Sequence, residues 1–147
     1  MLARSEALAI EAHVARPMRL VMIEDDLTLQ EVVREFLDDA EVCCFRSGPE
    51  ALEHCRTSDV DAVLLDINLH GPWDGWRVLE EFRALETAPP VILTTGVIEV
   101  TADGIDYPQL ELLPKPFRLG ELEQALGRVS TAAIDDESPI DSASPCS

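Results

Sequence analysis

The residues best suited to chemistry in this sequence are acids and one amine, each placed at or just beyond the end of a short apolar run. Glu24 and Asp25 follow the run RLVMI, Asp66 closes the run AVLLD, and Lys115 comes shortly after LELL. Lys115 is also the single lysine of the chain. Apolar runs of this length are typical of buried strands. We therefore expect these charged groups at strand ends, where the sheet meets solvent.

Between residues 18 and 129, such runs alternate with segments whose apolar residues recur at helical spacing. Strands that alternate with helices favour right-handed crossovers and a parallel sheet covered by helices on both faces. The sequence therefore predicts a doubly wound α/β domain. We predict strands over 19–23, 41–45, 62–66, 90–95 and 110–113, and helices over 27–40, 47–58, 76–86 and 118–130.

The connection that precedes the fifth strand departs from this alternation. Its sequence, GVIEVTADGIDYPQ, contains several β-branched residues, the turn signal Asp103-Gly104 and Pro108. All of these disfavour a helix. We expect the fourth helix of the domain to be short, frayed or missing.

The two ends of the chain differ in composition from its centre. Residues 1–17 form a mixed, mostly polar leader, and residues 130–147 form an acidic tail rich in Ser and Pro. Such compositions are typical of flexible segments. At 147 residues the chain has room for one domain with a core of its own. We predict a flexible leader, one domain over 18–129 and a disordered tail.

The net charge of the chain indicates which classes of binding partner are to be expected. It carries 29 acids against 11 lysines and arginines, for a net charge of −18. Nucleic-acid binding needs clustered cations, so we do not expect a nucleic-acid partner. The chain also lacks an apolar stretch long enough to cross a membrane, and its first residues carry charges where a signal peptide is apolar. We expect a cytoplasmic protein without a membrane partner.

Parallel sheets of this kind collect their functional groups outside the carboxyl ends of the strands. Glu24, Asp25 and Asp66 are expected to meet at that edge. Two carboxylates about 4 Å apart repel by about 4 kcal/mol at an effective dielectric constant near 20, so the cluster needs protons or a cation. Carboxylate oxygens are ligands that suit a hard ion such as Mg²⁺. The sequence thus predicts a magnesium site.

The same edge offers groups that can handle phosphate. Lys115 can pair with phosphate oxygens as a point charge. Asp66 can act as a carboxylate nucleophile that forms an aspartyl phosphate, with the metal and the lysine offsetting the charge of the transferred group.

Taken together, these motifs resemble the receiver domain of two-component response regulators over about residues 18–129. One motif alone is a weak signal, but several in register at successive strand ends are specific. The resemblance implies a flavodoxin-like, five-stranded parallel sheet with the strand order 2-1-3-4-5. The residues that carry it are Glu24-Asp25, Asp66, Thr95 and Lys115-Pro116-Phe117.

The resemblance also implies a role for each residue. Asp66 would accept phosphate from the phosphohistidine of a sensor histidine kinase or a histidine phosphotransfer protein. Mg²⁺ would be bound by Asp66, by Asp25 directly, by Glu24 through water and by the backbone carbonyl of Asn68.

Thr95 and Lys115 would each bind a phosphoryl oxygen. Thr95 is preferred over Thr94 because it is followed by Gly96, a small residue that lets the phosphoryl group approach. With no output segment visible after residue 130, we expect a stand-alone phosphoacceptor that is not an enzyme. It would signal through a downstream protein partner or relay the phosphate.

Three features depart from the family pattern. Leu112 stands where the family often has a Tyr or Phe that swings inward on activation, so an aromatic switch is not carried over. The loop after Asp66 is one residue longer than usual and contains His70, which can tune or attack the phosphate, although we expect a solvent-facing loop histidine. The connection after Thr95 is the third departure, since its poor helix removes part of the surface that many receivers use.

Two other functions fit the same residues. The chain can be the receiver part of a hybrid histidine kinase. Alternatively, a phosphatase of the haloacid dehalogenase type also uses an aspartate nucleophile with Mg²⁺, although that family places the acid on its first strand with a second aspartate two residues on. Here the acid is on the third predicted strand, and Asn68 occupies that second place.

Overall fold

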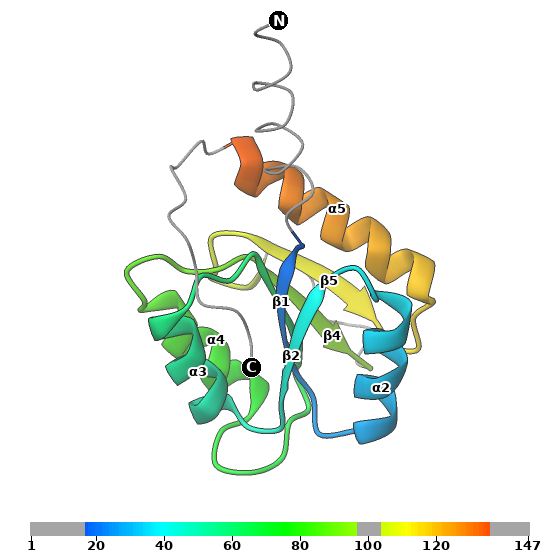
Figure 1. Cartoon of the computed structure of the whole chain (residues 1–147). Coiled ribbons are helices and arrows are strands. Elements are labelled where there is room, and N and C mark those ends of the chain that lie inside the picture. Colours follow the sequence, from blue (N-terminus) through cyan, green and yellow to red (C-terminus); the bar gives the residue numbers. More distant parts are fainter. Residues whose placement is uncertain (1–16, 97–103, 136–147) are drawn as a thin grey trace, which may run out of the picture.

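The computed structural model describes residues 17–96 and 104–135 of the chain (Figure 1). A five-stranded parallel sheet lies at its centre, in the predicted order β2-β1-β3-β4-β5. The central strand β1 is hydrogen-bonded to β2 on one side and to β3 on the other. The strands are β1 (Arg19–Ile23), β2 (Glu41–Phe45), β3 (Ala62–Asp66), β4 (Val91–Thr95) and β5 (Leu110–Pro114).

Helices cover both faces of the sheet, as expected for a doubly wound fold. Figure 1 shows α3 and α4 against one face and α2 and α5 against the other. The fold class and strand order predicted from the sequence are therefore confirmed. The helices are α2 (Leu27–Phe36), α3 (Gly48–Thr57), α4 (Gly75–Arg83) and α5 (Leu119–Asp135).

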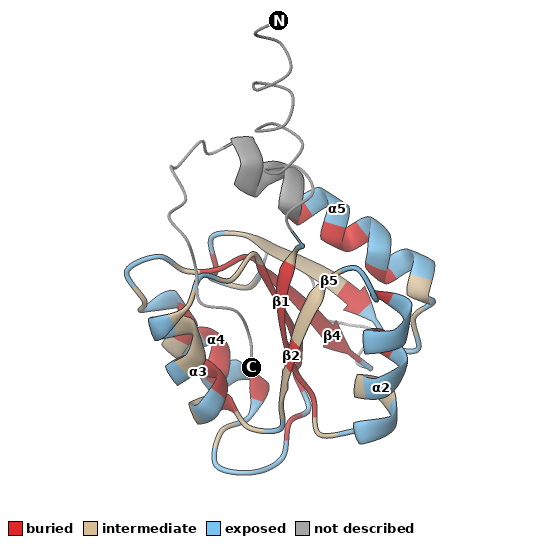
Figure 2. Cartoon of the chain, in the orientation of Figure 1, coloured by how far each residue is buried: buried red, intermediate tan, exposed pale blue. Residues whose placement is uncertain are grey.

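Alternation along the central strands builds the two halves of the core. Val21 and Ile23 of β1 pack toward α3 and α4, whereas Leu20 and Met22 pack toward α2 and α5. All five residues of β1, β3 and β4 are buried, as the red strands of Figure 2 show. Because the three central strands are held from both faces, the groups at their carboxyl ends rest on a rigid support.

The helices that follow the site begin at aspartate caps. The carboxylate of Asp26 accepts hydrogen bonds from the amides of Thr28 and Leu29 at the start of α2. The carboxylate of Asp74 accepts one from Arg77 at the start of α4. Such caps satisfy amides that have no partner within the helix, and they fix where the two loops of the site end.

Several element boundaries differ from the prediction. The helix predicted over 27–40 ends at Phe36, and the helix predicted over 118–130 extends to Asp135. Most of the connection predicted to hold a short or missing fourth helix, residues 97–103, lies outside the described residues, while residues 105–109 are not helical. The predicted leader and most of the predicted tail are also outside them.

None of the helices in the described parts of the chain is both long enough and apolar enough to span a bilayer.

Candidate functional site

The carboxyl ends of β1 and β3 bring three acids together, because these strands are neighbours in the sheet. One carboxylate oxygen from each of Glu24, Asp25 and Asp66 lies within 4.8 Å of the others. The sequence predicted this cluster because parallel strands end at a common edge of the sheet, and the structure places all three residues in it. An arrangement of this kind fits a divalent cation, because every donor is an oxygen of an acid and like charges at such distances repel.

Glu24 is the most deeply buried acid of the cluster, with 4% of its side chain exposed. Its Oε2 accepts a hydrogen bond from the amide of Asp26 at 3.2 Å, and its Oε1 accepts one from the Lys115 amine at 3.1 Å. Burial raises the pKa of Glu24, the charge of Asp66 raises it further, and Lys115 offsets only part of this. The electrostatic field at Glu24 therefore favours a bound cation or proton.

Asp25 is more open than Glu24, with 28% of its side chain exposed. Its Oδ2 lies 2.8 Å from Nδ1 of His70, a residue of the loop that follows β3. The hydrogen bond from His70 lowers the pKa of Asp25, and burial opposes this effect. The same contact raises the pKa of His70. Asp25 is therefore the acid of the cluster best placed to meet an ion arriving from solvent.

Lys115 follows β5 directly, and its amide donates to the carbonyl of Thr95 at 2.7 Å. Its amine lies 3.1 Å from Glu24 Oε1 and 3.3 Å from Asp66 Oδ2. Burial alone would lower the pKa of Lys115, but the hydrogen bond and charge of Glu24, with Asp66, outweigh it and raise the pKa. The lysine is therefore held as a cation between two buried acids, at the edge of the sheet where the sequence placed it.

Asp66 ends β3 with only 6% of its side chain exposed. Its Oδ1 accepts a hydrogen bond from the amide of Asn68 at 3.0 Å, which turns the chain sharply after the strand. Gly75 then lies against the strand end, with its amide bonded to the carbonyl of Ile67. A Cβ added at Gly75 would lie 2.4 Å from Ile67 Cα and 2.9 Å from the carbonyl oxygen of Asp66. This position therefore needs glycine so that α4 can begin beside Asp66.

Thr94 and Thr95 lie at the end of β4, and both are buried. Thr94 is the register partner of Asp66, and its hydroxyl donates to the carbonyl of Leu65 at 3.3 Å. Thr95 stands one residue further toward the open edge of the sheet and is the register partner of Pro114, just before Lys115. The threonine pair is thus beside the acid cluster.

Two loop and strand residues add to the sequence-based view. Leu112 is partly buried and packs against the core on the side of α3 and α4. His70 is exposed, as expected for a loop histidine, yet it contacts Asp25, which lies 45 residues away in the sequence. In the sequence, His70 is close to Asp66, whose charge also acts on it, but nothing in the sequence indicated the direct contact with Asp25.

The carboxyl edge of this doubly wound sheet thus gathers three acids, a buried threonine pair and one lysine. The family model of the response regulator receiver domain matches residues 20–127. The chain therefore belongs to the response regulator receiver family, a signalling domain of two-component systems.

Curated relatives agree with this assignment. The chain is 32% identical over 112 residues to the transcriptional regulatory protein CiaR of Streptococcus pneumoniae, covering 74% of this chain and 50% of that protein. It is 31% identical over 108 residues to the transcriptional regulatory protein HprR of Escherichia coli, covering 71% of this chain and 48% of that protein. The chain thus spans about half the length of these relatives.

Solved structures show the same fold. The receiver domain of the sensor histidine kinase PA1611 from Pseudomonas aeruginosa is 25% identical, with a TM-score of 0.69, over 78% of this chain and 98% of that one. That structure has a magnesium ion coordinated in its active-site cleft. The signal receiver domain of an HD domain-containing protein from Pseudomonas fluorescens has a TM-score of 0.72 at 20% identity, over 82% and 99% of the two chains.

Proposed function

We propose that Asp66 accepts a phosphoryl group from a phosphohistidine donor in a magnesium-dependent reaction. The observation that carries the proposal is the position of Lys115, whose amine is 3.3 Å from Asp66 Oδ2. A fixed cation beside a buried carboxylate is what a developing phosphoryl charge requires. The donor would be a sensor histidine kinase or a histidine phosphotransfer protein.

The proposed transfer is a substitution at phosphorus. A carboxylate oxygen of Asp66 bonds to phosphorus while the bond between phosphorus and the donor imidazole nitrogen breaks, and the imidazole keeps the electron pair. Lys115 pairs with one phosphoryl oxygen, and Thr95 is the hydroxyl that bonds another. Thr94 is the weaker candidate because Thr95 is the residue directly followed by Gly96, a small residue that lets the phosphoryl group approach.

The metal is the second part of the proposal. Glu24, Asp25, Asp66 and the backbone carbonyl of Asn68 would hold Mg²⁺. The three carboxylates fit this ion because their oxygens converge, and the outermost of them, Asp25, is partly exposed to solvent. When bound, Mg²⁺ offsets the negative charge of the acids and of the phosphoryl oxygens.

The signal would then pass through protein contacts or onward transfer of the phosphate. The relatives named as transcriptional regulators are proteins of which this chain spans about half. The net charge of −18 disfavours a nucleic-acid surface on the chain itself. We therefore infer a downstream protein partner for this domain, in a cytoplasmic setting.

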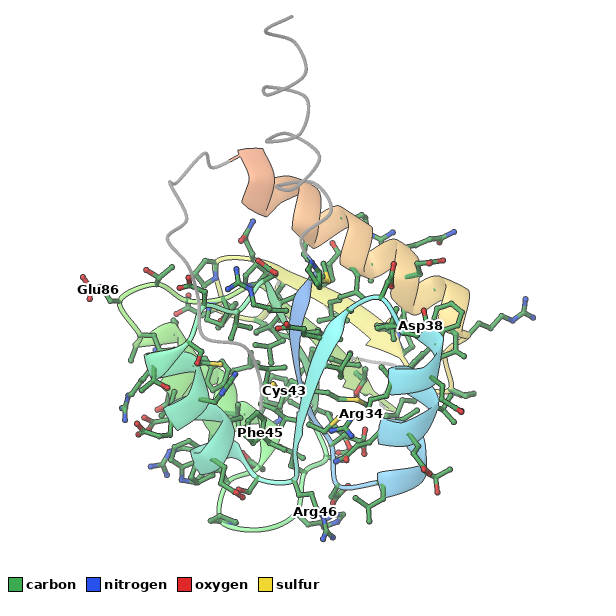
Figure 3. The ribbon with its side chains drawn as sticks, viewed as in Figure 1. Arg34, Asp38, Cys43, Phe45, Arg46 and Glu86 are labelled. Atoms are coloured by element: carbon green, nitrogen blue, oxygen red, sulfur yellow. The ribbon has the colours of Figure 1, made fainter. Side chains whose placement is uncertain are left out.

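A small phosphodonor tests the proposal directly. The wild-type protein, incubated with acetyl phosphate and Mg²⁺, should gain the mass of one phosphoryl group, and Asp66→Asn should gain none. Asp38→Asn is a matched control, because Asp38 is an exposed acid just beyond the carboxyl-terminal end of α2, far from the strand ends of the site (Figure 3). It should be modified like the wild type. An unchanged wild-type mass contradicts the proposal.

The same assay separates the rival functions. A phosphatase of the haloacid dehalogenase type would turn over a generic phosphate ester many times, whereas a receiver is modified once per chain. Multiple turnovers that require Asp66 would favour the phosphatase. This assay gives the same result whether the domain is a stand-alone receiver or the receiver part of a hybrid kinase. The mass of the natural full-length protein distinguishes these two cases.

A further inference from the structure

We propose that His70 is a positioning residue of the metal site, which holds the carboxylate of Asp25 with one oxygen turned toward the ion. The inference rests on the proposed magnesium-dependent function and goes beyond it by assigning a role to a residue of the lengthened loop. The observation behind it is the 2.8 Å distance between His70 Nδ1 and Asp25 Oδ2.

The chemistry of the two groups fixes the direction of this hydrogen bond. A carboxylate that binds a cation is ionised and only accepts hydrogen bonds, and Oδ2 of Asp25 lies 2.8 Å from Nδ1 of His70. Nδ1 must therefore carry the hydrogen and donate it to Oδ2. An oxygen of Asp25 lies within 4.8 Å of oxygens of Glu24 and Asp66. Because Oδ2 is bonded to His70, we assign the other oxygen, Oδ1, to the ion.

Each acid of the cluster is oriented by a donor of its own. Glu24 accepts hydrogen bonds from Lys115 and from the amide of Asp26. Asp66 accepts one from the amide of Asn68. His70 fills the same role for Asp25, which is the most exposed of the three acids and so has the most freedom to rotate. Donors that orient a ligating carboxylate affect metal affinity although they never touch the ion.

The loop that carries His70 is anchored on both sides of it. Leu69 is buried, and Gly71 adopts a φ of 107°, which favours glycine. Trp73 packs closely on α3, because a Cβ added at Gly48 would lie 2.8 Å from Trp73 Cε3. The guanidinium of Arg77 lies 4.9 Å from the centroid of the Trp73 ring. The main chain thus places the imidazole over Asp25, although 88% of the His70 side chain is exposed.

Magnesium affinity, measured by titration calorimetry at one fixed pH, tests the inference. Removing the donor with His70→Ala should weaken Mg²⁺ binding about tenfold, at the lower end of the range for such partners. His70→Asn places an amide nitrogen where Nδ1 stands, without a charge, and should bind within about threefold of the wild type. Arg56→Ala removes an exposed cation from α3 and controls for the change in net charge.

The outcomes are distinct. Unchanged or tighter binding by His70→Ala overturns the inference, and so does His70→Asn binding as weakly as His70→Ala. The proposed function is judged separately, by the phosphorylated mass of the wild type. If the wild type is phosphorylated and the histidine variants bind Mg²⁺ normally, only the role of His70 fails. If His70 controls Mg²⁺ affinity but Asp66 accepts no phosphate, only the proposed function fails.

Discussion

Lys115 sits between two carboxylates that are almost fully buried, Glu24 and Asp66. A buried acid that loses its partner is costly, because desolvation is no longer offset by a nearby charge. Burial, and then the charge of Asp66, raise the pKa of Glu24 even with the lysine in place. The side chain therefore contributes to the fold as well as to the proposed chemistry.

Replacing Lys115 should measurably lower the stability of the domain. We expect Lys115→Ala to lower the free energy of unfolding at neutral pH by about 1.5–3 kcal/mol, the range for hydrogen bonds to charged groups. Added Mg²⁺ should restore part of the loss, because the ion supplies the missing charge. Urea denaturation with and without Mg²⁺ measures both effects. Arg56→Ala, which breaks only an exposed pair with Glu53, should cost less than about 1 kcal/mol. An equal loss in the two variants would contradict the argument.

The sequence predicted which residues form the acid cluster better than it predicted which side chains contact each other. Glu24, Asp25 and Asp66 could be placed together because parallel strands end at a common edge. The pairing of His70 with Asp25 could not be predicted, because it depends on the path of a loop and on the direction of a side chain. The difference in exposure between Glu24 and Asp25, adjacent residues, was equally hidden.

The turn from β3 into α4 ties the position of Asp66 to a helix. Gly75 is the first residue of α4, and the atoms nearest to an added Cβ are main-chain atoms of Ile67 and Asp66. Main-chain atoms at a strand end cannot move aside as a flexible side chain would. The start of this helix and the end of β3 that carries Asp66 are thus mechanically coupled.

Gly75→Ala tests this coupling. We expect it to lower the free energy of unfolding by about 1–3 kcal/mol, as overpacking does, and to slow phosphorylation of Asp66 by acetyl phosphate. Gly120→Ala in α5 is the matched control, because nothing lies within 4 Å of its added Cβ. The control should be neutral or more stable by up to about 1 kcal/mol, since alanine favours the helix. Thermal and urea unfolding measure both variants, and equal stability of Gly75→Ala and wild type would refute the coupling.

The strands of the fold were easier to predict from the sequence than the ends of its helices. Buried strands were predicted well because a short, uniformly apolar run bounded by polar residues has few other interpretations. Helix ends were less certain. The early end of α2 at Phe36 is understandable, because Asp38 and Asp39 follow it and acids are unfavourable at a helix carboxyl terminus. The prediction from apolar periodicity extended this helix to residue 40, because the spacing of apolar residues does not reflect the unfavourable charge of acids at a helix carboxyl terminus.

The stability of the whole domain toward alkali depends on a tyrosine far from the acid cluster. Tyr107 is buried in the core shared with α3 and α4, and its hydroxyl donates to the carbonyl of Pro89 at 2.6 Å. Burial raises the pKa of Tyr107 above its ordinary value of 10.0, and the nearby Cys55 adds to this. The stabilising effect is complete below pH 10 and is lost as the pH rises toward the folded-state pKa, because the unfolded chain releases the proton first.

Tyr107→Phe separates the contribution of the buried hydrogen bond to stability from the effect of the raised tyrosine pKa on the pH dependence of stability. At pH 7 the variant should lose about 1 kcal/mol, the worth of a typical hydrogen bond. Between pH 9 and about 11 its stability should fall less steeply than that of the wild type, because phenylalanine has no proton to release. Urea midpoints at several pH values provide the measurement. Parallel pH curves for the two proteins would show that Tyr107 does not titrate on unfolding.

The loop between β3 and α4, which packs on α3 through Trp73, can be observed by tryptophan fluorescence. Trp73 and Trp76 are the two tryptophans of the chain, and they differ in environment, since Trp73 is half-buried against Gly48 while 46% of Trp76 is exposed. In a Trp76→Phe background, the remaining indole emits from the loop that joins β3 to α4. Its fluorescence would report the arrival of an ion or a phosphoryl group in real time, without an added dye.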